Sequence, residues 1–295
     1  MAATVTPAEV ADGYAEWIER TGFSPGTKQV YVTKVRNFTD WLAEQDGRYA
    51  DAFSDEWVRD YAARDYRRHM LVDLGRKPAT VQLSMSAVTS FFRWLGMDAP
   101  RGVNVDVPRS APKALTTEQT REVLRAAERR GPRDLAIASL IFLAGPRVAE
   151  VAALNVDDVF LSERMGQAQI RYGKGGKPRT IPLTSQVRGH LRAWMVDRKK
   201  WAGADGPALF LSHRGGRLSI RSTQDAISQC GEGAGIKLSP HILRHTFGRR
   251  FVEAGGHIEA LRELMGHSDV RTTAGYTRAS REYLEDAVAR LDVDL

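Results

Sequence analysis

The most informative stretch of this 295-residue chain is SPHILRHTF, which begins at Ser239. Serine caps free backbone amides and proline fits the first helical position, so Ser239 and Pro240 predict the start of a helix. His241, Arg244 and His245 then share one face at i, i+3 and i+4. A helix N-terminus with two imidazoles and a guanidinium favours a bound phosphate, because its N–H groups and dipole attract anions. For His245 alone, a hydrogen-bonded place in the core is the preferred interpretation.

A second stretch, GPRVAE, follows an apolar run over residues 133–144 that predicts a buried helix. Gly145 breaks this helix, and Pro146 suits the first position of the next one. Arg147 then lies in the first turn, with Glu150 three residues later on the same face. Taken alone, this spacing favours a surface ion pair over a functional group.

A third stretch, LMGHS, predicts a turn between two helices. Gly266 ends the first helix and Ser268 caps the second, so His267 lies in the turn. Tyr276 comes at the end of that second, short helix. Taken alone, a tyrosine near a helix end is usually structural.

The charge of the chain is unevenly distributed. The formal charge is +7, and residues 1–110 carry a net −1 whereas residues 111–295 carry a net +8. The basic excess indicates an anionic partner for the second part. Cys230 is the single cysteine, which excludes a disulfide scaffold and a zinc finger. A signal peptide and a long apolar run are both missing from the sequence, so we expect a cytoplasmic protein.

The first part of the chain predicts a bundle of four helices separated by turn signals. The expected helices cover residues 8–20, 25–42, 54–70 and 78–95. A stretch with three prolines and two glycines follows, without apolar periodicity. We therefore expect a helical domain over residues 1–97, a linker over 98–113 and a second domain over 114–295.

The second part predicts a mainly α domain with a small antiparallel β-sheet. Two short extended runs flank a glycine-rich hairpin turn, GKGGKP, and a third short strand follows later. The expected strands cover residues 167–172, 179–183 and 208–211. The expected helices cover residues 116–129, 133–144, 186–201, 220–230, 240–255, 257–265, 269–276 and 281–291.

Together, these motifs resemble the tyrosine recombinase, or phage integrase, family. The resemblance rests on the order and spacing of the motifs over residues 114–291, and the first domain resembles the family's core-binding domain only in pattern. It implies a four-helix, SAM-like core-binding domain and a mixed α+β catalytic domain. The candidate catalytic residues that match the family's motifs are Arg147, Lys174, His241, Arg244, His267 and Tyr276, with Glu150 as the supporting acid.

The sequence departs from the family pattern at a few positions. Ala144 and Pro146 stand around the first arginine in place of a threonine and an aliphatic residue, and Met265 stands in place of a leucine. Lys177 competes with Lys174, because both lie in the same hairpin turn. Every charged or nucleophilic position of the pattern is filled.

The resemblance implies a site-specific recombinase that cuts and rejoins DNA through a 3′-phosphotyrosyl link to Tyr276. Arg147, Arg244 and His267 would then stabilise the charge on the phosphate. His241 would accept the phenol proton, and Lys174 would protonate the leaving 5′ oxygen. These cations predict a reaction without metal, and the lack of a GxxxxGK[ST] loop agrees with a reaction without ATP.

The family resemblance also implies partners. We expect double-stranded DNA and a tetramer on two DNA sites, formed by this chain alone or with a related recombinase. The predicted helix 281–291 would dock on a neighbouring subunit or on its own domain. The two-domain plan is similar both to Xer-type resolvases and to simple integrases of mobile elements.

Two other functions are compatible with parts of the sequence. A zinc-dependent hydrolase would use His241, His245 and His267 as ligands, although Ile242 stands where the HExxH motif has its glutamate. A DNA-binding protein without cleavage activity is supported by charge alone.

Overall fold

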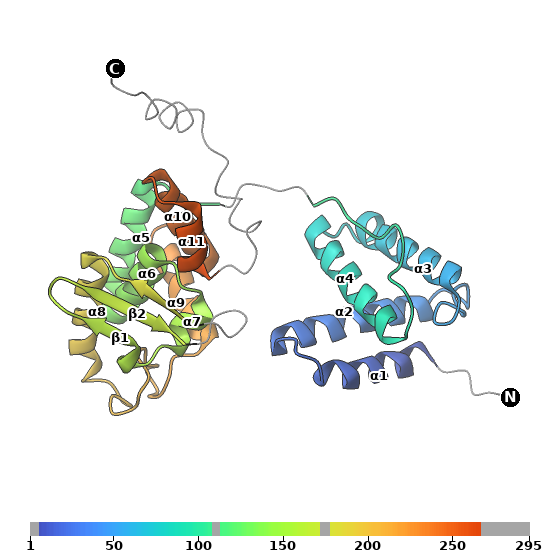
Figure 1. Cartoon of the computed structure of the whole chain (residues 1–295), viewed down its shortest axis with the longest axis horizontal. Helices are drawn as coiled ribbons and strands as arrows, with labels where there is room; N and C mark the ends of the chain where they lie inside the picture. The colour runs from blue at the N-terminus through green and yellow to red at the C-terminus, as the bar shows by residue number, and fades with distance from the viewer. Residues whose placement is uncertain (1–5, 108–112, 172–177, 267–295) are drawn as a thin grey trace, which may run out of the picture. The chain divides into compact units, whose positions relative to one another are not determined.

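The computed structural model describes residues 6–107, 113–171 and 178–266. The chain divides into two compact units, residues 1–110 and 111–295 (Figure 1). The sequence predictions on Lys174, Lys177, His267 and Tyr276, and those of the helices 269–276 and 281–291, lie outside the described residues.

The first unit contains the four predicted helices, each of which begins where a capping residue or proline marks it. They are α1 (Pro7–Glu19), α2 (Pro25–Ala43), α3 (Glu56–Arg68) and α4 (Pro78–Trp94). The side chains of Thr6, Ser24 and Asp55 accept the free amides at the first three helix starts. One π-helical turn, His69–Asp73, prolongs α3 and was not predicted.

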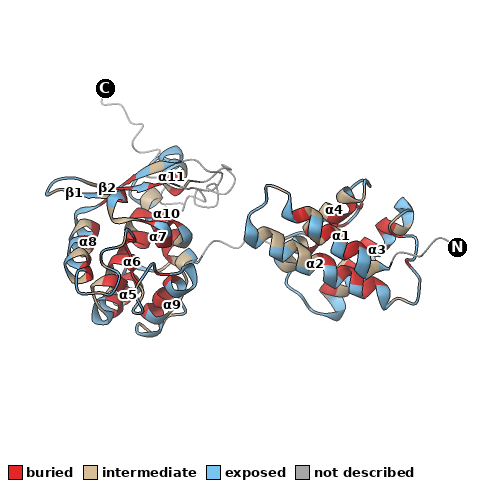
Figure 2. Cartoon of the chain, turned by 90° about the horizontal axis from the view of Figure 1, so that it is seen from below, coloured by how far each residue is buried: buried red, intermediate tan, exposed pale blue. Residues whose placement is uncertain are grey.

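The core of the first unit is rich in aromatic side chains. Tyr14, Phe38 and Phe91 are completely buried, and the rings of Tyr14 and Phe91 meet edge to face at 5.6 Å. Figure 2 shows that the buried residues lie on the faces that the helices turn toward one another. Val103 and Val105 pack against the same core, so the chain stays attached to this unit well past the end of α4.

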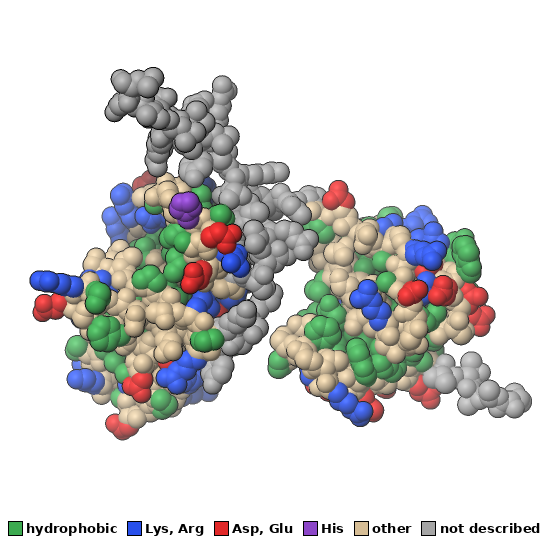
Figure 3. All heavy atoms as spheres, in the orientation of Figure 1, with side chains coloured by type: hydrophobic (Ala, Val, Ile, Leu, Met, Phe, Trp, Pro, Cys, Tyr) green, Lys and Arg blue, Asp and Glu red, His purple; other side chains and the backbone are tan. Residues whose placement is uncertain are grey.

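Basic and acidic side chains are mixed on the surface of the first unit. Figure 3 shows Lys and Arg groups among Asp and Glu groups on the face in view. Exposed pairs join α1 to α2 through Arg36 and Asp12, and α3 to the preceding loop through Asp65 and Arg48. This mixing agrees with the nearly neutral charge of the first unit.

The second unit is built around α6, the apolar helix that the sequence places centrally. Helices α5, α8, α9 and α10 pack against it, and most of its side chains are buried. The helices are α5 (Thr117–Arg130), α6 (Pro132–Ala144), α7 (Val148–Ala153), α8 (Ser185–Arg198), α9 (Ile220–Glu232), α10 (Pro240–Glu253) and α11 (Ile258–Met265), with a 3₁₀ turn at Val156–Asp158.

A small antiparallel sheet completes the second unit. Its strands are β1 (Val159–Leu161), β2 (Gly166–Ile170) and β3 (Arg179–Pro182), in the order β1-β2-β3. Ala168 pairs with Ile181, and both side chains are buried against the core. The prediction of a mainly α fold with a small antiparallel sheet is therefore confirmed.

The structure differs from the predicted strands in two places. Strand β1 was missed, because three residues are too few to show an alternating pattern. The predicted strand 208–211 forms only isolated bridges, from Ala208 to Asn155 and from Leu211 to Arg217. Its apolar run reflects burial in the core rather than membership of the sheet. Among the described residues, no helix is long and apolar enough to cross a membrane.

Candidate active site

Arg147 occupies the N-cap of α7 rather than its first turn. Helix α7 begins at Val148, so the prediction that Pro146 takes the first helical position was wrong. The reason is the side chain of Glu150, whose Oε2 accepts the backbone amide of Arg147 at 2.7 Å. This hydrogen bond holds Arg147 in an extended conformation, with φ −74° and ψ 151°.

Glu150 is the centre of a buried network with two arginines. Its Oε1 accepts Nη1 of Arg147 at 3.0 Å, which is the i, i+3 pair that the sequence predicts. Arg179 approaches the same carboxylate from β3 and donates Nη1 to Oε1 at 2.9 Å and Nη2 to Oε2 at 2.7 Å. The predicted interpretation as a surface ion pair was wrong, because the side chain of Glu150 is only 4% exposed.

The sequence analysis missed Arg179. A signal for it exists, because Arg179 and Ile181 are two residues apart on β3 and side chains alternate along a strand. Ile181 faces the core, so Arg179 shares the core-facing side of the strand. An arginine in that position needs a buried acid, and Glu150 is the acid that it finds.

Glu150 is ionised in this network. Burial acts to raise its pKa, but the hydrogen bonds from Arg179 and from the Arg147 amide, together with the two guanidinium charges, hold the pKa below the ordinary value. One carboxylate thus faces two guanidinium groups, and the cluster carries a net positive charge. Arg147 is the more exposed of the two, at 26% against 9% for Arg179.

Arg244 projects from α10 into the core of the second unit. It is buried, and its guanidinium donates Nη1 to the carbonyl of Gly145 and Nη2 to the carbonyl of Met265. His241 on the preceding turn is exposed, and His245 is half buried. The rings of His241 and His245 lie 6.5 Å apart. The three side chains of the predicted face therefore differ in burial: His241 is exposed, His245 is half buried and Arg244 is buried.

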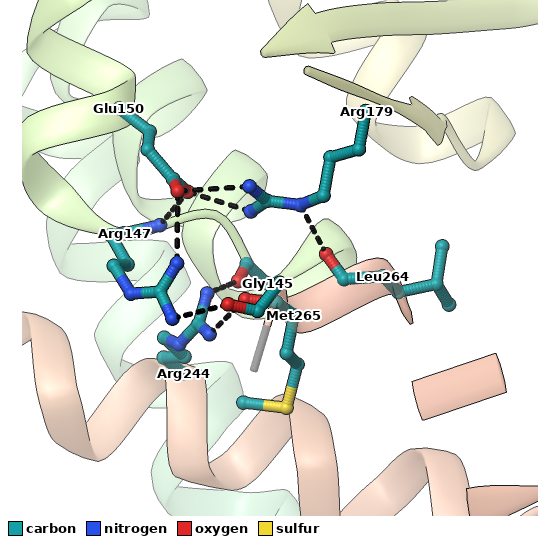
Figure 4. A network of polar contacts seen from close by, with 8 residues as sticks. Gly145, Arg147, Glu150, Arg179, Arg244, Leu264 and Met265 are labelled. Carbon is teal, nitrogen blue, oxygen red and sulfur yellow. Dashed lines mark hydrogen bonds and ion pairs between the residues drawn. The ribbon is translucent and has the colours of Figure 1, made fainter. Parts of the chain in front are cut away.

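The end of α11 brings these arginines together. The last carbonyls of a helix have no partner within it, and here three consecutive ones each accept a different arginine (Figure 4). Leu264 accepts Nε of Arg179 at 2.9 Å, Met265 accepts Arg244, and Gly266 accepts Nη2 of Arg147 at 2.7 Å. Both predicted arginines therefore meet at two adjacent carbonyls, those of Met265 and Gly266, at the end of α11.

Two glycines make this arrangement possible. Gly145 and Gly266 end α6 and α11 in the left-handed conformation, with φ of 73° and 60°. A Cβ on Gly145 would lie 2.4 Å from the ring of Phe247, and a Cβ on Gly266 would lie 2.8 Å from Nη1 of Arg179. Both positions therefore require glycine for conformation and for space.

His245 adds a neutral ring beside Arg244. Burial lowers the pKa of His245, and the nearby His241 and Arg244 lower it further. The imidazole is therefore uncharged at neutral pH and adds no positive charge to the cluster.

The fold and the cluster of arginines define a member of the phage integrase family. Residues 113–282 match the phage integrase family, and residues 11–97 match the phage integrase N-terminal SAM-like domain. The chain therefore belongs to this family, and the predicted family resemblance is confirmed.

Several relatives of this chain are Xer recombinases. The chain is 31% identical to the tyrosine recombinase XerA of Thermococcus kodakarensis, over 95% of this chain and 94% of the relative. It is also 31% identical to the tyrosine recombinase XerD of Bifidobacterium longum, over 90% and 91%. The fold matches a crystal structure of XerH site-specific recombinase bound to its difH substrate, with a TM-score of 0.72, 17% identity and coverage of 97% and 85%.

These comparisons overturn the alternative of a zinc-dependent hydrolase. The relatives are recombinases, and the histidines that the alternative takes as zinc ligands, His241, His245 and His267, stand within the matched family region. The alternative of a DNA-binding protein without cleavage is set aside on the same ground, since the matched relatives are enzymes of recombination.

Proposed function

We propose that this chain is a site-specific DNA recombinase in which Tyr276 forms a 3′-phosphotyrosyl link to the cleaved strand. The observation that carries this proposal is the convergence of Arg147 and Arg244 on the end of α11. Their guanidinium groups donate to the adjacent carbonyls of Gly266 and Met265, although α7 and α10 are far apart in the chain. Two permanent cations next to each other form a suitable site for one phosphodiester.

The cleavage step conserves the number of phosphate ester bonds. The phenol oxygen of Tyr276 attacks the scissile phosphorus, and the bond from phosphorus to the 5′ oxygen breaks. His241 accepts the phenol proton and Lys174 donates a proton to the 5′ oxygen. Charge on the non-bridging oxygens is stabilised by Arg147, Arg244 and His267.

A phenol needs this help because its ordinary pKa is about 10. Strand exchange follows when the 5′-hydroxyl of a second DNA attacks the phosphotyrosine and releases Tyr276. Because the ester bond energy is retained, the cycle needs no ATP.

We further propose that the functional unit is a tetramer on two double-stranded DNA sites. Residues 1–97 and 114–295 would each bind the duplex, with residues 98–113 linking them. The basic excess of residues 111–295 supports contacts to the phosphate backbone. The proposed helix 281–291 would dock on a neighbouring subunit. XerH, a neighbour in fold, was crystallised bound to its difH substrate.

The experiment that tests the proposal is trapping of the covalent adduct. A binding site is first selected from a pool of random-sequence duplexes. The selected duplex is then nicked beside the cleavage position, so that cleavage releases a short fragment with a free 5′-hydroxyl, which diffuses away. We expect a protein–DNA adduct on a denaturing gel and a nucleotide on Tyr276 by mass spectrometry. An adduct that persists in Tyr276→Phe would refute the assignment of the nucleophile.

The general acid is tested with a matched pair of lysines from one hairpin turn. Lys174→Ala should slow cleavage by about 100-fold, since general acid catalysis contributes on that order. Lys177→Ala should slow it much less. The opposite ranking would transfer the role to Lys177.

A further inference from the structure

We propose that Arg179 is a positioning residue for the reaction, which keeps the charge of Arg147 available for the scissile phosphate. The inference rests on the proposed role of Arg147 in binding phosphate. Arg179 does not reach the surface as Arg147 does: its side chain is 9% exposed. It acts through Glu150, whose carboxylate it binds with both Nη atoms.

The first step of the argument concerns charge. Glu150 is buried and ionised, so it must be neutralised by a cation close by. If Arg147 were its single partner, the pair would carry no net charge and would attract a phosphate weakly. Arg179 supplies a second cation to the same carboxylate, and the cluster of Arg147, Glu150 and Arg179 carries a net charge of about +1.

The second step concerns geometry. Arg179 occupies both carboxylate oxygens from one side, at 2.9 and 2.7 Å, which fixes the plane of the carboxylate. In that plane, Oε2 accepts the backbone amide of Arg147 and Oε1 accepts its Nη1. The orientation of Arg147 therefore depends on Arg179, which acts on it through the carboxylate of Glu150.

The third step concerns the neighbouring elements. Nε of Arg179 donates to the carbonyl of Leu264, so one side chain joins β3 to the last turn of α11. Arg179 is the first residue of β3 and follows the GKGGKP turn directly. Strand β3 is thus tied at its first residue to the carboxylate that holds Arg147.

Three variants separate charge from geometry. Arg179→Gln removes one of the two cations, so that Arg147 alone neutralises the charge of Glu150. Arg179→Lys keeps the charge, but an ammonium group cannot bind both oxygens in the plane of the carboxylate. The double variant Arg179→Gln/Glu150→Gln removes one positive and one negative charge, so the net charge at this position is the same as in the wild type and the charge of Arg147 is not neutralised by Glu150.

The first measurement is single-turnover cleavage of the nicked duplex at saturating DNA. We expect Arg179→Gln and Arg179→Lys to lower the rate about 10- to 100-fold, because a small misplacement of a catalytic group has effects on that order. With Glu150→Gln also measured alone, the double variant should cleave faster than the product of the Arg179→Gln and Glu150→Gln losses predicts. Independent, multiplicative losses would overturn the inference.

The second measurement does not depend on cleavage. Duplex binding is followed against salt concentration in a Tyr276→Phe background. The slope of log affinity against log salt should fall by about one in Arg179→Gln and be restored in Arg179→Lys and in the double variant, as expected for one phosphate contact. An unchanged slope in Arg179→Gln would overturn the charge argument, whether or not wild-type protein cleaves DNA.

A matched control comes from the same sheet. Arg171 follows β2 and pairs with the buried carboxylate of Asp158, which places another arginine–carboxylate pair outside the Glu150 network. Arg171→Gln should lower thermal stability and leave the saturated cleavage rate within a few-fold of wild type. If Arg171→Gln slows cleavage as much as the Arg179 variants do at a similar loss of melting temperature, Arg179 is structural and the inference fails. Absence of a Tyr276 adduct in wild type would instead refute the proposed function.

Discussion

The arginine–carboxylate cluster around Arg59 in the first unit and the cluster around Glu150 in the second unit are built in opposite ways. In the first unit, Arg59 is 1% exposed, binds Oδ1 of Asp60 at 2.8 and 2.9 Å, and has Glu56 at 3.8 Å, so one cation faces two acids. In the second unit, Glu150 faces Arg147 and Arg179, so one acid faces two cations.

The difference in charge balance accompanies a difference in what the two clusters contact. Arg59 also donates to the carbonyl of Asp98 at 3.0 Å, and Asp60 accepts the amide of Arg101 at 3.1 Å. The first cluster therefore fastens the chain after α4 to α3, and the positive charge of Arg59 is neutralised within it. The second cluster retains a positive charge and exposes part of Arg147, which is what a phosphate site requires. Burial of an arginine alone does not indicate function.

The strongest test of this comparison exchanges the two arginines for glutamine. Arg147→Gln should lower the single-turnover cleavage rate by about 10²- to 10³-fold, the usual loss for one stabilising donor. Arg59→Gln should leave the cleavage rate of folded protein unchanged and lower the free energy of unfolding by about 3 kcal/mol, because Asp60 becomes an unpaired buried charge. Cleavage assays and urea unfolding measure the two effects. A folded Arg59→Gln protein that cleaves as slowly as Arg147→Gln would remove the distinction.

A second test uses two glycines with the same backbone conformation. Gly75 in the first unit has φ 56° and open space around it, whereas Gly266 has φ 60° and the Arg179 guanidinium 2.8 Å from its added Cβ. Each alanine substitution should cost about 1 kcal/mol of stability for the left-handed conformation. Gly266→Ala should also slow cleavage about tenfold by displacing Arg179. Equal cleavage rates for Gly75→Ala and Gly266→Ala would show that Arg179 tolerates displacement.

The smallest expected effect is a pH dependence of stability in the second unit. Burial lowers the pKa of His245 and of His190 below the ordinary 6.5. The unfolded chain therefore binds a proton before the folded chain does, and stability falls as pH decreases from about 7 through 6.5. His245→Gln should flatten this part of the profile, and His190→Gln should flatten it independently. Melting temperatures measured from pH 5 to 8 that show the same slope in both variants and in wild type would contradict the assignment.

Much of the fold follows from local sequence patterns. The four helices of the first unit and the central helix α6 lie where apolar spacing, caps and prolines predict them. The sequence spacing also predicts the pair of Arg147 and Glu150, because these two residues are three positions apart. Strand β1 was missed because its pattern is too short. The start of α7 was predicted too early, at Pro146, because the side chain of Glu150 accepts the backbone amide of Arg147 and keeps Arg147 outside the helix.

The sequence by itself determined the family, the helical architecture and the identity of the candidate catalytic residues, because these depend on motifs and periodicities within a few residues of one another. Only the tertiary structure decided which groups share the buried carboxylate and the end of α11. The contacts of Arg179 with Glu150 and Leu264, and of Arg147 with Gly266, span 29, 85 and 119 positions. Contacts over such distances form when separate elements pack around one core, and no local pattern records them.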